Sequence, residues 1–156
     1  MSPKVEWPET TAPKAILSFL DTFFGLLDEP TDEASQEWSE LFTENGAYLF
    51  SRTSQCFGRK DIRKQRDFVQ AAWPHMTHFV DGVYTSDVDG LHVVVRGGWS
   101  VPQEDGSSVI GRSVAAYDLV RTEGRIYIKK LEIYADPTVL VSLIAGKSEP
   151  GSSIKP

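Results

Sequence analysis

Apolar residues in the first half of the chain recur every three or four positions, which is the spacing of one face of a helix. Three such groups occur: Ile16, Leu20, Phe23, Phe24 and Leu27; then Ala34, Trp38, Leu41 and Phe42; then Ile62, Val69 and Trp73, with Gln65 and Arg66 on the same side. They predict three helices. The first is expected to begin near Pro13, Asn45-Gly46 to stop the second, and Pro74 to end the third.

The second half of the chain changes to the two-residue alternation of strands. A short strand is predicted at residues 47–51, and four long strands at 75–85, 91–101, 109–121 and 125–134. The segments between the long strands are short and contain glycine, as antiparallel hairpins require, and they leave no room for parallel crossovers. In the second long strand, Val93, Val95 and Trp99 lie opposite His92, so we expect this apolar face to look inward.

Helices followed by strands predict one α+β domain, in which three helices pack on a curled antiparallel sheet with a concave, ligand-enclosing side. We expect residues 14–145 to form it, since 156 residues with 40% hydrophobic content can fill one core. Residues 1–13 carry three prolines and residues 146–156 are rich in Gly, Ser and Pro, so both ends are expected to be flexible. Residues 137–145 are expected to form a last short helix or strand, between which the pattern does not choose.

Composition narrows the range of partners. The formal net charge of −6 argues against nucleic acid or an anionic membrane surface, because either would attract a basic patch. Asp61 and Asp67 interrupt the basic residues of the third helix, which predicts a solvated face there: Arg59, Lys60, Arg63, Lys64 and Arg66. Residues 1–13 lack the pattern of a secretion signal, and the longest apolar run, 139–145, is too short to span a bilayer. We therefore expect a cytoplasmic protein without a membrane partner.

No metal or cofactor is expected from the motifs. His75 and His78 are three positions apart on a predicted strand, so they point to opposite faces and make a poor metal pair. Gly97-Gly98 is not followed by the residues that hold a nucleotide phosphate. Cys56 is the only cysteine, which excludes an internal disulfide, and the sequence offers it no activating partner.

His78 is the strongest candidate for chemistry. On its predicted strand it shares a face with Met76, Val80, Gly82 and Tyr84, a mostly apolar set. A polar ring in such a place needs a partner, because burying it without a hydrogen bond is costly. Two interpretations remain open: a structural histidine bonded to a backbone carbonyl, or an acid-base group that points into a cavity.

The order of three helices, a short strand and a curled sheet resembles the NTF2-like fold, the cone shared by ketosteroid isomerase, SnoaL-type cyclases and scytalone dehydratase. The resemblance covers roughly residues 14–137. Its sharpest local match, Thr77-His78-Phe79-Val80-Asp81-Gly82, resembles the segment around the catalytic histidine of scytalone dehydratase. Leu27-Asp28 resembles a Tyr-Asp pair of that family, which implies that Asp28 hydrogen-bonds His78 and orients its ring. The alternative is that Asp28 caps the helix that starts near Thr31.

Other positions depart from the family. Phe50 falls where scytalone dehydratase has a catalytic tyrosine and roughly where ketosteroid isomerase has its base, and Tyr48 lies two residues away on the same face. The second family histidine aligns approximately with Trp99 or Ser100, and the family asparagine falls near Ala115. The scytalone reaction itself is therefore not expected.

Two tyrosines can supply an acid. Tyr117 shares a strand face with Ser113, which the resemblance implies is the inner one, so Tyr48 or Tyr117 is expected to donate a proton to a substrate oxygen, with core packing as the alternative. Arg112 and Glu132, on neighbouring strands, are expected to form a cross-strand ion pair. The residues expected to contact the substrate are Phe24, Phe50, Trp73, Met76, Val80, Trp99 and Ser113.

These residues predict a cofactor-independent isomerase, cyclase or dehydratase for a small, hydrophobic, oxygenated molecule of polyketide or terpenoid type. His78 would be the base, Asp28 its orienting partner, and Tyr48 or Tyr117 the acid. Two alternatives remain: a non-catalytic NTF2-like module that binds a ligand or a protein, and an epoxide hydrolase, whose carboxylate pair and arginine the sequence does not place. The outer sheet face, rich in Val and Ile, predicts a homodimer.

Overall fold

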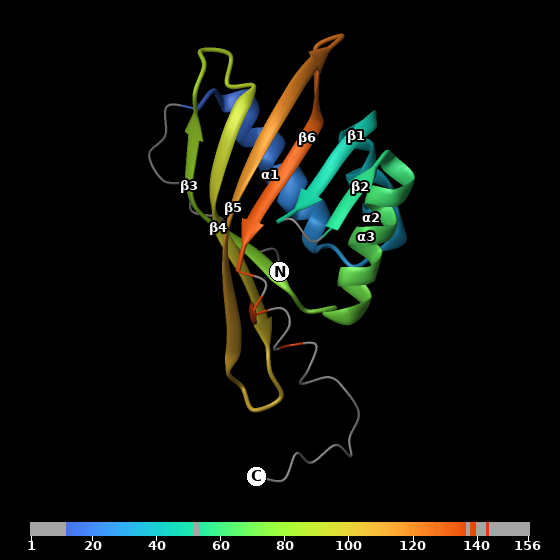
Figure 1. Cartoon of the computed structure of the whole chain (residues 1–156), viewed down its shortest axis with the longest axis vertical. Helices are drawn as coiled ribbons and strands as arrows, with labels where there is room; N and C mark the ends of the chain where they lie inside the picture. Colours follow the sequence, from blue (N-terminus) through green and yellow to red (C-terminus); the bar gives the residue numbers. More distant parts are fainter. Residues whose placement is uncertain (1–11, 52–53, 137, 140–142, 144–156) are drawn as a thin grey trace.

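The computed structural model describes residues 12–51, 54–136, 138–139 and 143. Within these residues three helices and six strands follow one another as α1 (Lys14–Asp28), α2 (Asp32–Glu40), β1 (Phe42–Phe50), β2 (Ser54–Phe57), α3 (Arg59–Ala72), β3 (Thr77–Thr85), β4 (His92–Pro102), β5 (Ser108–Thr122) and β6 (Arg125–Ala135). The α+β class and the order of helices before the main sheet are confirmed (Figure 1). Residues 1–11 and 146–156 lie outside the described ranges, so their flexibility stays a prediction, whereas Ala12 is buried in the core. Of residues 137–145, the described Thr138, Val139 and Leu143 are helical.

The second helix is shorter than its apolar pattern predicts. It begins after Thr31, whose side chain accepts a hydrogen bond from the Ala34 backbone, and it ends at Glu40. Asn45-Gly46 does not stop this helix but lies inside β1, at an irregular part of that strand. The apolar Phe42 belongs to the strand and is fully buried there, which explains why its spacing from Trp38 mimicked a longer helix.

The sheet is mixed, and the prediction of an antiparallel sheet is wrong at one pair. Its strand order is β2-β1-β6-β5-β4-β3, and β1 pairs with β6 in parallel. The hairpins β3-β4, β4-β5 and β5-β6 are antiparallel, as their short connections require. The parallel pair joins strands separated by α3 and four further strands, a connection long enough to bring the chain back in the same direction.

The helices cover one face of this sheet, and the main core lies between them (Figure 1). Ile16 and Leu20 of α1 are fully buried against sheet residues that include Val93 and Leu131. The predicted inward face of β4 is therefore confirmed. None of the helices in the described part of the chain combines the length and the apolar character needed to cross a bilayer.

A bulge in β3 changes which side chains share a face with His78. The register of β3 against β4 shifts between Val80 and Gly82, so one extra residue reverses the alternation. Val83 is buried beyond the bulge, whereas Tyr84 is 53% exposed. Tyr84 therefore does not share the inner face of His78, contrary to the simple two-residue alternation.

Candidate functional site

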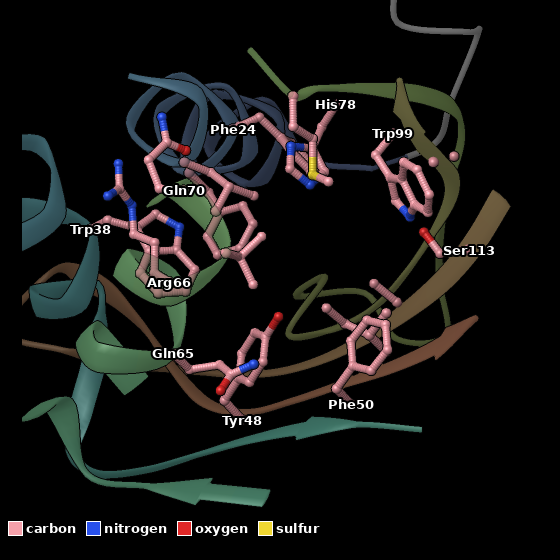
Figure 2. A pocket seen from close by; sticks show the side chains of 18 of the residues that line it. Phe24, Trp38, Tyr48, Phe50, Gln65, Arg66, Gln70, His78, Trp99 and Ser113 are labelled. Atoms are coloured by element: carbon pink, nitrogen blue, oxygen red, sulfur yellow. The ribbon is translucent and has the colours of Figure 1, made fainter. Parts of the chain in front are cut away.

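A cavity of about 340 Å³ lies between the helices and the inner face of the sheet. Aromatic and aliphatic side chains make up most of its lining, with a few polar groups among them (Figure 2). Six of the seven predicted contact residues line it: Phe24, Phe50, Trp73, Met76, Trp99 and Ser113. Val80 does not line the cavity, because its side chain is buried in the main core. An apolar chamber of this size suits a small hydrophobic molecule.

His78 and Asp28 meet at the edge of this cavity. The His78 ring nitrogen Nδ1 lies 2.6 Å from Asp28 Oδ1, and the His78 backbone N–H donates to Asp28 Oδ2 at 2.9 Å. An ionised carboxylate only accepts hydrogen bonds, so Nδ1 donates to Asp28, and in the neutral ring the lone pair is then on Nε2. Asp28 does not cap the second helix, since Thr31 does.

The positions of the pair follow from the elements that carry it. Asp28 is the last residue of α1, and His78 is the second residue of β3. Both side chains are largely buried, at 12% and 21% exposed. The Phe24 ring, one helical turn before Asp28, lies 6.1 Å from the His78 ring, centroid to centroid. One carboxylate thus holds both the backbone and the ring of His78, beside the Phe24 ring.

Tyr48 and Tyr117 also line the cavity, on β1 and β5. In Figure 2 the Tyr48 hydroxyl points inward from the wall opposite His78. Burial raises the pKa of Tyr48 far above its usual range, and the nearby Cys56 adds to this rise. Burial likewise raises the pKa of Tyr117, with a further contribution from Tyr48. Both hydroxyls are therefore protonated at neutral pH and are suited to donate, not to act as bases.

Arg66 is a polar residue of the site that sequence reasoning placed wrongly. It was expected on a solvated face of α3, but it is 5% exposed and lines the cavity wall. Its Nη2 donates to the backbone carbonyls of Leu26 and Glu29 at 2.7 and 2.6 Å. Burial lowers its pKa, against the opposing effect of the Asp67 and Asp28 carboxylates. The signal was present in the sequence, since Arg66 shares the apolar helical face of Ile62.

Solved structures share this architecture. A protein described as a SnoaL-like polyketide cyclase from Jannaschia sp. CCS1 superimposes with a TM-score of 0.69 at 15% identity, covering 92% of this chain and 99% of that one. An NTF2-like protein of unknown function from Exiguobacterium sp. 255-15 matches with a TM-score of 0.61 at 22% identity, over 76% of this chain and 98% of that one. The chain has the NTF2-like fold.

A third solved structure bears a name that matches the sequence resemblance. It is described as a scytalone dehydratase from Novosphingobium aromaticivorans DSM 12444, with a TM-score of 0.64 at 16% identity over 79% of this chain and 83% of that one. No protein-family model and no curated protein matches the sequence. At these identities the likeness establishes the fold, and the chemistry has to be argued from the site.

The remaining polar groups restrict what this NTF2-like cavity can hold. Ser54, Gln65, Gln70 and Ser113 offer neutral hydrogen-bonding groups, and none of the described lining residues is Asp or Glu. The carboxylate pair required for epoxide hydrolysis is thus not found among them. Within the described ranges, no three His, Cys, Asp or Glu side chains gather as metal ligands would. The lining suits a neutral, oxygen-bearing organic molecule.

Arg112 and Glu132 do not pair with each other. Arg112 Nη1 lies 2.9 Å from Asp81 Oδ2, and its guanidinium sits over the Phe79 ring at 5.7 Å from the centroid. Glu132 pairs with Lys130 at 2.7 Å. Glu132 lies opposite Ala116, four residues along β5 from Arg112, and each residue pairs with a nearer opposite charge, so the predicted cross-strand pair is wrong.

Proposed function

We propose that this protein is a cofactor-independent isomerase, cyclase or dehydratase acting on a small, hydrophobic, oxygenated molecule. The observation that carries the proposal is the 2.6 Å contact between His78 Nδ1 and Asp28 Oδ1 at the wall of an apolar cavity. In the neutral ring, a proton on Nδ1 leaves the lone pair on Nε2, which can remove a proton from carbon or from a hydroxyl group. The names of the cyclase and dehydratase neighbours agree with this reaction class.

The reaction needs a base, a group that orients it, and an acid. His78 Nε2 takes a proton made acidic by an adjacent carbonyl, and the Asp28 carboxylate stabilises the imidazolium that forms. Tyr48 or Tyr117 donates a hydrogen bond to the substrate oxygen where negative charge develops, or lends it a proton that returns to the tyrosine when the carbonyl re-forms. The proton on His78 then returns to another atom of the substrate, or to a departing hydroxyl, which balances the cycle without a cofactor. General acid-base help of this kind is worth about 10² to 10⁴ in rate.

The first test is hydrogen exchange into a ketone probe. In D₂O, the wild type is expected to speed deuterium incorporation next to the carbonyl of 2-tetralone, followed by proton NMR. His78→Gln should lose most of this acceleration, about 10²-fold or more, because the base is gone. Near-ultraviolet circular dichroism checks that the variant is folded.

The chain offers a matched control for this test. His92 Nδ1 lies 3.0 Å from Asp118 Oδ1, so it forms the same type of pair, but the His92 side chain is 62% exposed and lies outside the cavity lining. His92→Gln is expected to exchange the probe as fast as wild type. Equal exchange by wild type and His78→Gln would contradict the proposal.

A non-catalytic binding module is the second candidate. Phe50 in place of the family tyrosine and the mostly apolar lining favour it, since both serve binding without chemistry. Cavity tryptophans such as Trp73 and Trp99 make binding visible by fluorescence. Quenching by 2-tetralone without any exchange above the His78→Gln rate would support this candidate over an enzyme.

A further inference from the structure

The C-terminal end of α1 depends on a side chain from another helix. The carbonyl of Leu26 would accept from the backbone N–H of residue 30 if the helix continued, but residue 30 is a proline and has no N–H. Arg66 Nη2, from α3, donates to this carbonyl at 2.7 Å and to that of Glu29 at 2.6 Å. One buried guanidinium therefore closes the last turn of α1.

These two carbonyls bracket Asp28, the residue that holds His78. A carboxylate at the C-terminus of a helix lies at the negative end of the helix dipole, which is unfavourable. The last turn of α1 contains no basic residue that would offset this charge. Arg66 brings a positive charge to the same place and is close enough to Asp28 for the two charges to interact. It therefore acts on both the position and the charge of Asp28.

We propose that Arg66 is a positioning residue, which holds the last turn of α1 so that Asp28 fixes the His78 ring. This inference rests on the proposed function, because positioning matters only if the His78–Asp28 pair acts. The Arg66 side chain is buried at the cavity wall. Removing its guanidinium would leave the carbonyls of Leu26 and Glu29 without this hydrogen-bond donor, which is costly for buried groups. Asp28 is then free to leave His78.

The test reads the pair directly by NMR of ¹⁵N-labelled protein. Wild type is expected to give one His78 ring tautomer, with the proton on Nδ1, and a slowly exchanging His78 backbone N–H. In Arg66→Met the Nδ1 proton signal should be lost or split between tautomers. The His78 backbone N–H should exchange about tenfold faster or more, because the local structure opens more often. Unchanged His78 signals in a folded Arg66→Met protein would overturn the proposal.

Arg63→Met is the matched control, one turn earlier on the same helix. Arg63 pairs with Asp32 at 2.5 Å and also with Asp67, which Arg66 contacts too, so its loss removes a charge from α3 and leaves the two Arg66 bonds to α1 in place. The His78 signals should stay as in wild type. An equal effect of Arg63→Met would mean that the charge of α3, and not Arg66, holds the pair, which would also overturn the proposal.

A second measurement covers the case in which Arg66→Met does not fold. Asp28→Asn is expected to shift the guanidinium signals of Arg66, whereas Asp32→Asn should shift those of Arg63 and leave Arg66 unmoved. Arg66 signals that ignore Asp28→Asn would contradict the inference. Both readouts work without a substrate, so they are independent of the exchange test. If the protein fails the exchange test but Arg66 still controls the His78 signals, the proposed activity is rejected and the role of Arg66 is upheld.

Discussion

At the scale of single residues, the site combines a histidine–carboxylate pair with neutral acids. His78 and Asp28 are fifty positions apart in sequence, yet two hydrogen bonds join them. Tyr48 and Tyr117 face the same cavity, and burial keeps both in the protonated form. A base with a free lone pair and donors that never ionise at neutral pH are complementary parts of acid-base chemistry.

The buried tyrosines predict a loss of stability in alkali. Their pKa values are raised in the folded protein, while an unfolded tyrosine titrates near 10. Their contribution to stability is therefore complete below about pH 10, and above it the unfolded state alone loses protons. The free energy of unfolding should fall by up to about 1.4 kcal/mol per pH unit for each tyrosine.

Tyr117→Phe tests this effect, with urea unfolding measured between pH 9 and pH 11. The variant is expected to lose stability less steeply with pH than wild type, because one titrating group has been removed. An exposed tyrosine serves as control: Tyr84→Phe should keep the wild-type slope, since Tyr84 is 53% exposed. Parallel curves for wild type and Tyr117→Phe would refute the assignment.

At the scale of elements, the strand that carries His78 is shaped by its contact with β4. Gly97 lies opposite Val80, next to the bulge in β3. A Cβ atom at Gly97 would lie 2.0 Å from the Phe79 carbonyl oxygen, which is backbone and cannot turn away. The close approach of β3 at its bulge therefore requires glycine at position 97, and this local geometry determines where β3 places His78.

Gly97→Ala is expected to destabilise the fold by several kcal/mol and to shift the NMR signals of β3, because backbone atoms have to move.

Gly25→Ala should have the opposite effect on stability. Gly25 is exposed inside α1 and has open space around its Cβ position, so the change should stabilise the protein by about 0.5–1 kcal/mol. Thermal unfolding of both variants measures these changes. A Gly97→Ala protein as stable as wild type would contradict the packing argument.

At the scale of the whole molecule, the outer face of the sheet exposes large apolar side chains. Tyr84 and Val94 lie opposite each other on β3 and β4, and Val114 and Tyr134 on β5 and β6, all of them at least 38% exposed. An apolar surface of this kind on a sheet is typical of an interface. The homodimer inferred from the sequence therefore stays a prediction, with a defined surface.

Light scattering at micromolar concentration tests the dimer. The wild type is expected to have twice the mass of the chain, and Val114→Glu should give monomers, because a buried unpaired charge is costly. Val88→Glu, at a residue 96% exposed outside the strands, is the control and should leave the dimer intact. A monomeric wild type would reject the prediction.

The sequence by itself determined the elements whose signals are local. Helical spacing marked α1 and α3, and alternation with glycine turns marked the antiparallel hairpins, because these patterns depend on neighbours within a few residues. The family resemblance led to His78 and Asp28, and the contact that it implied is present in the structure.

Tertiary structure alone decided what depends on distant segments. The parallel pairing of β1 with β6, the bulge at Val80, and the burial of Arg66 under the end of α1 each need a partner far away in the chain. Helical spacing placed Arg66 on the apolar face of α3, but no local pattern identifies its partners, the carbonyls of Leu26 and Glu29. Burial and hydrogen bonding of such groups are settled when the layers pack, which no local pattern contains.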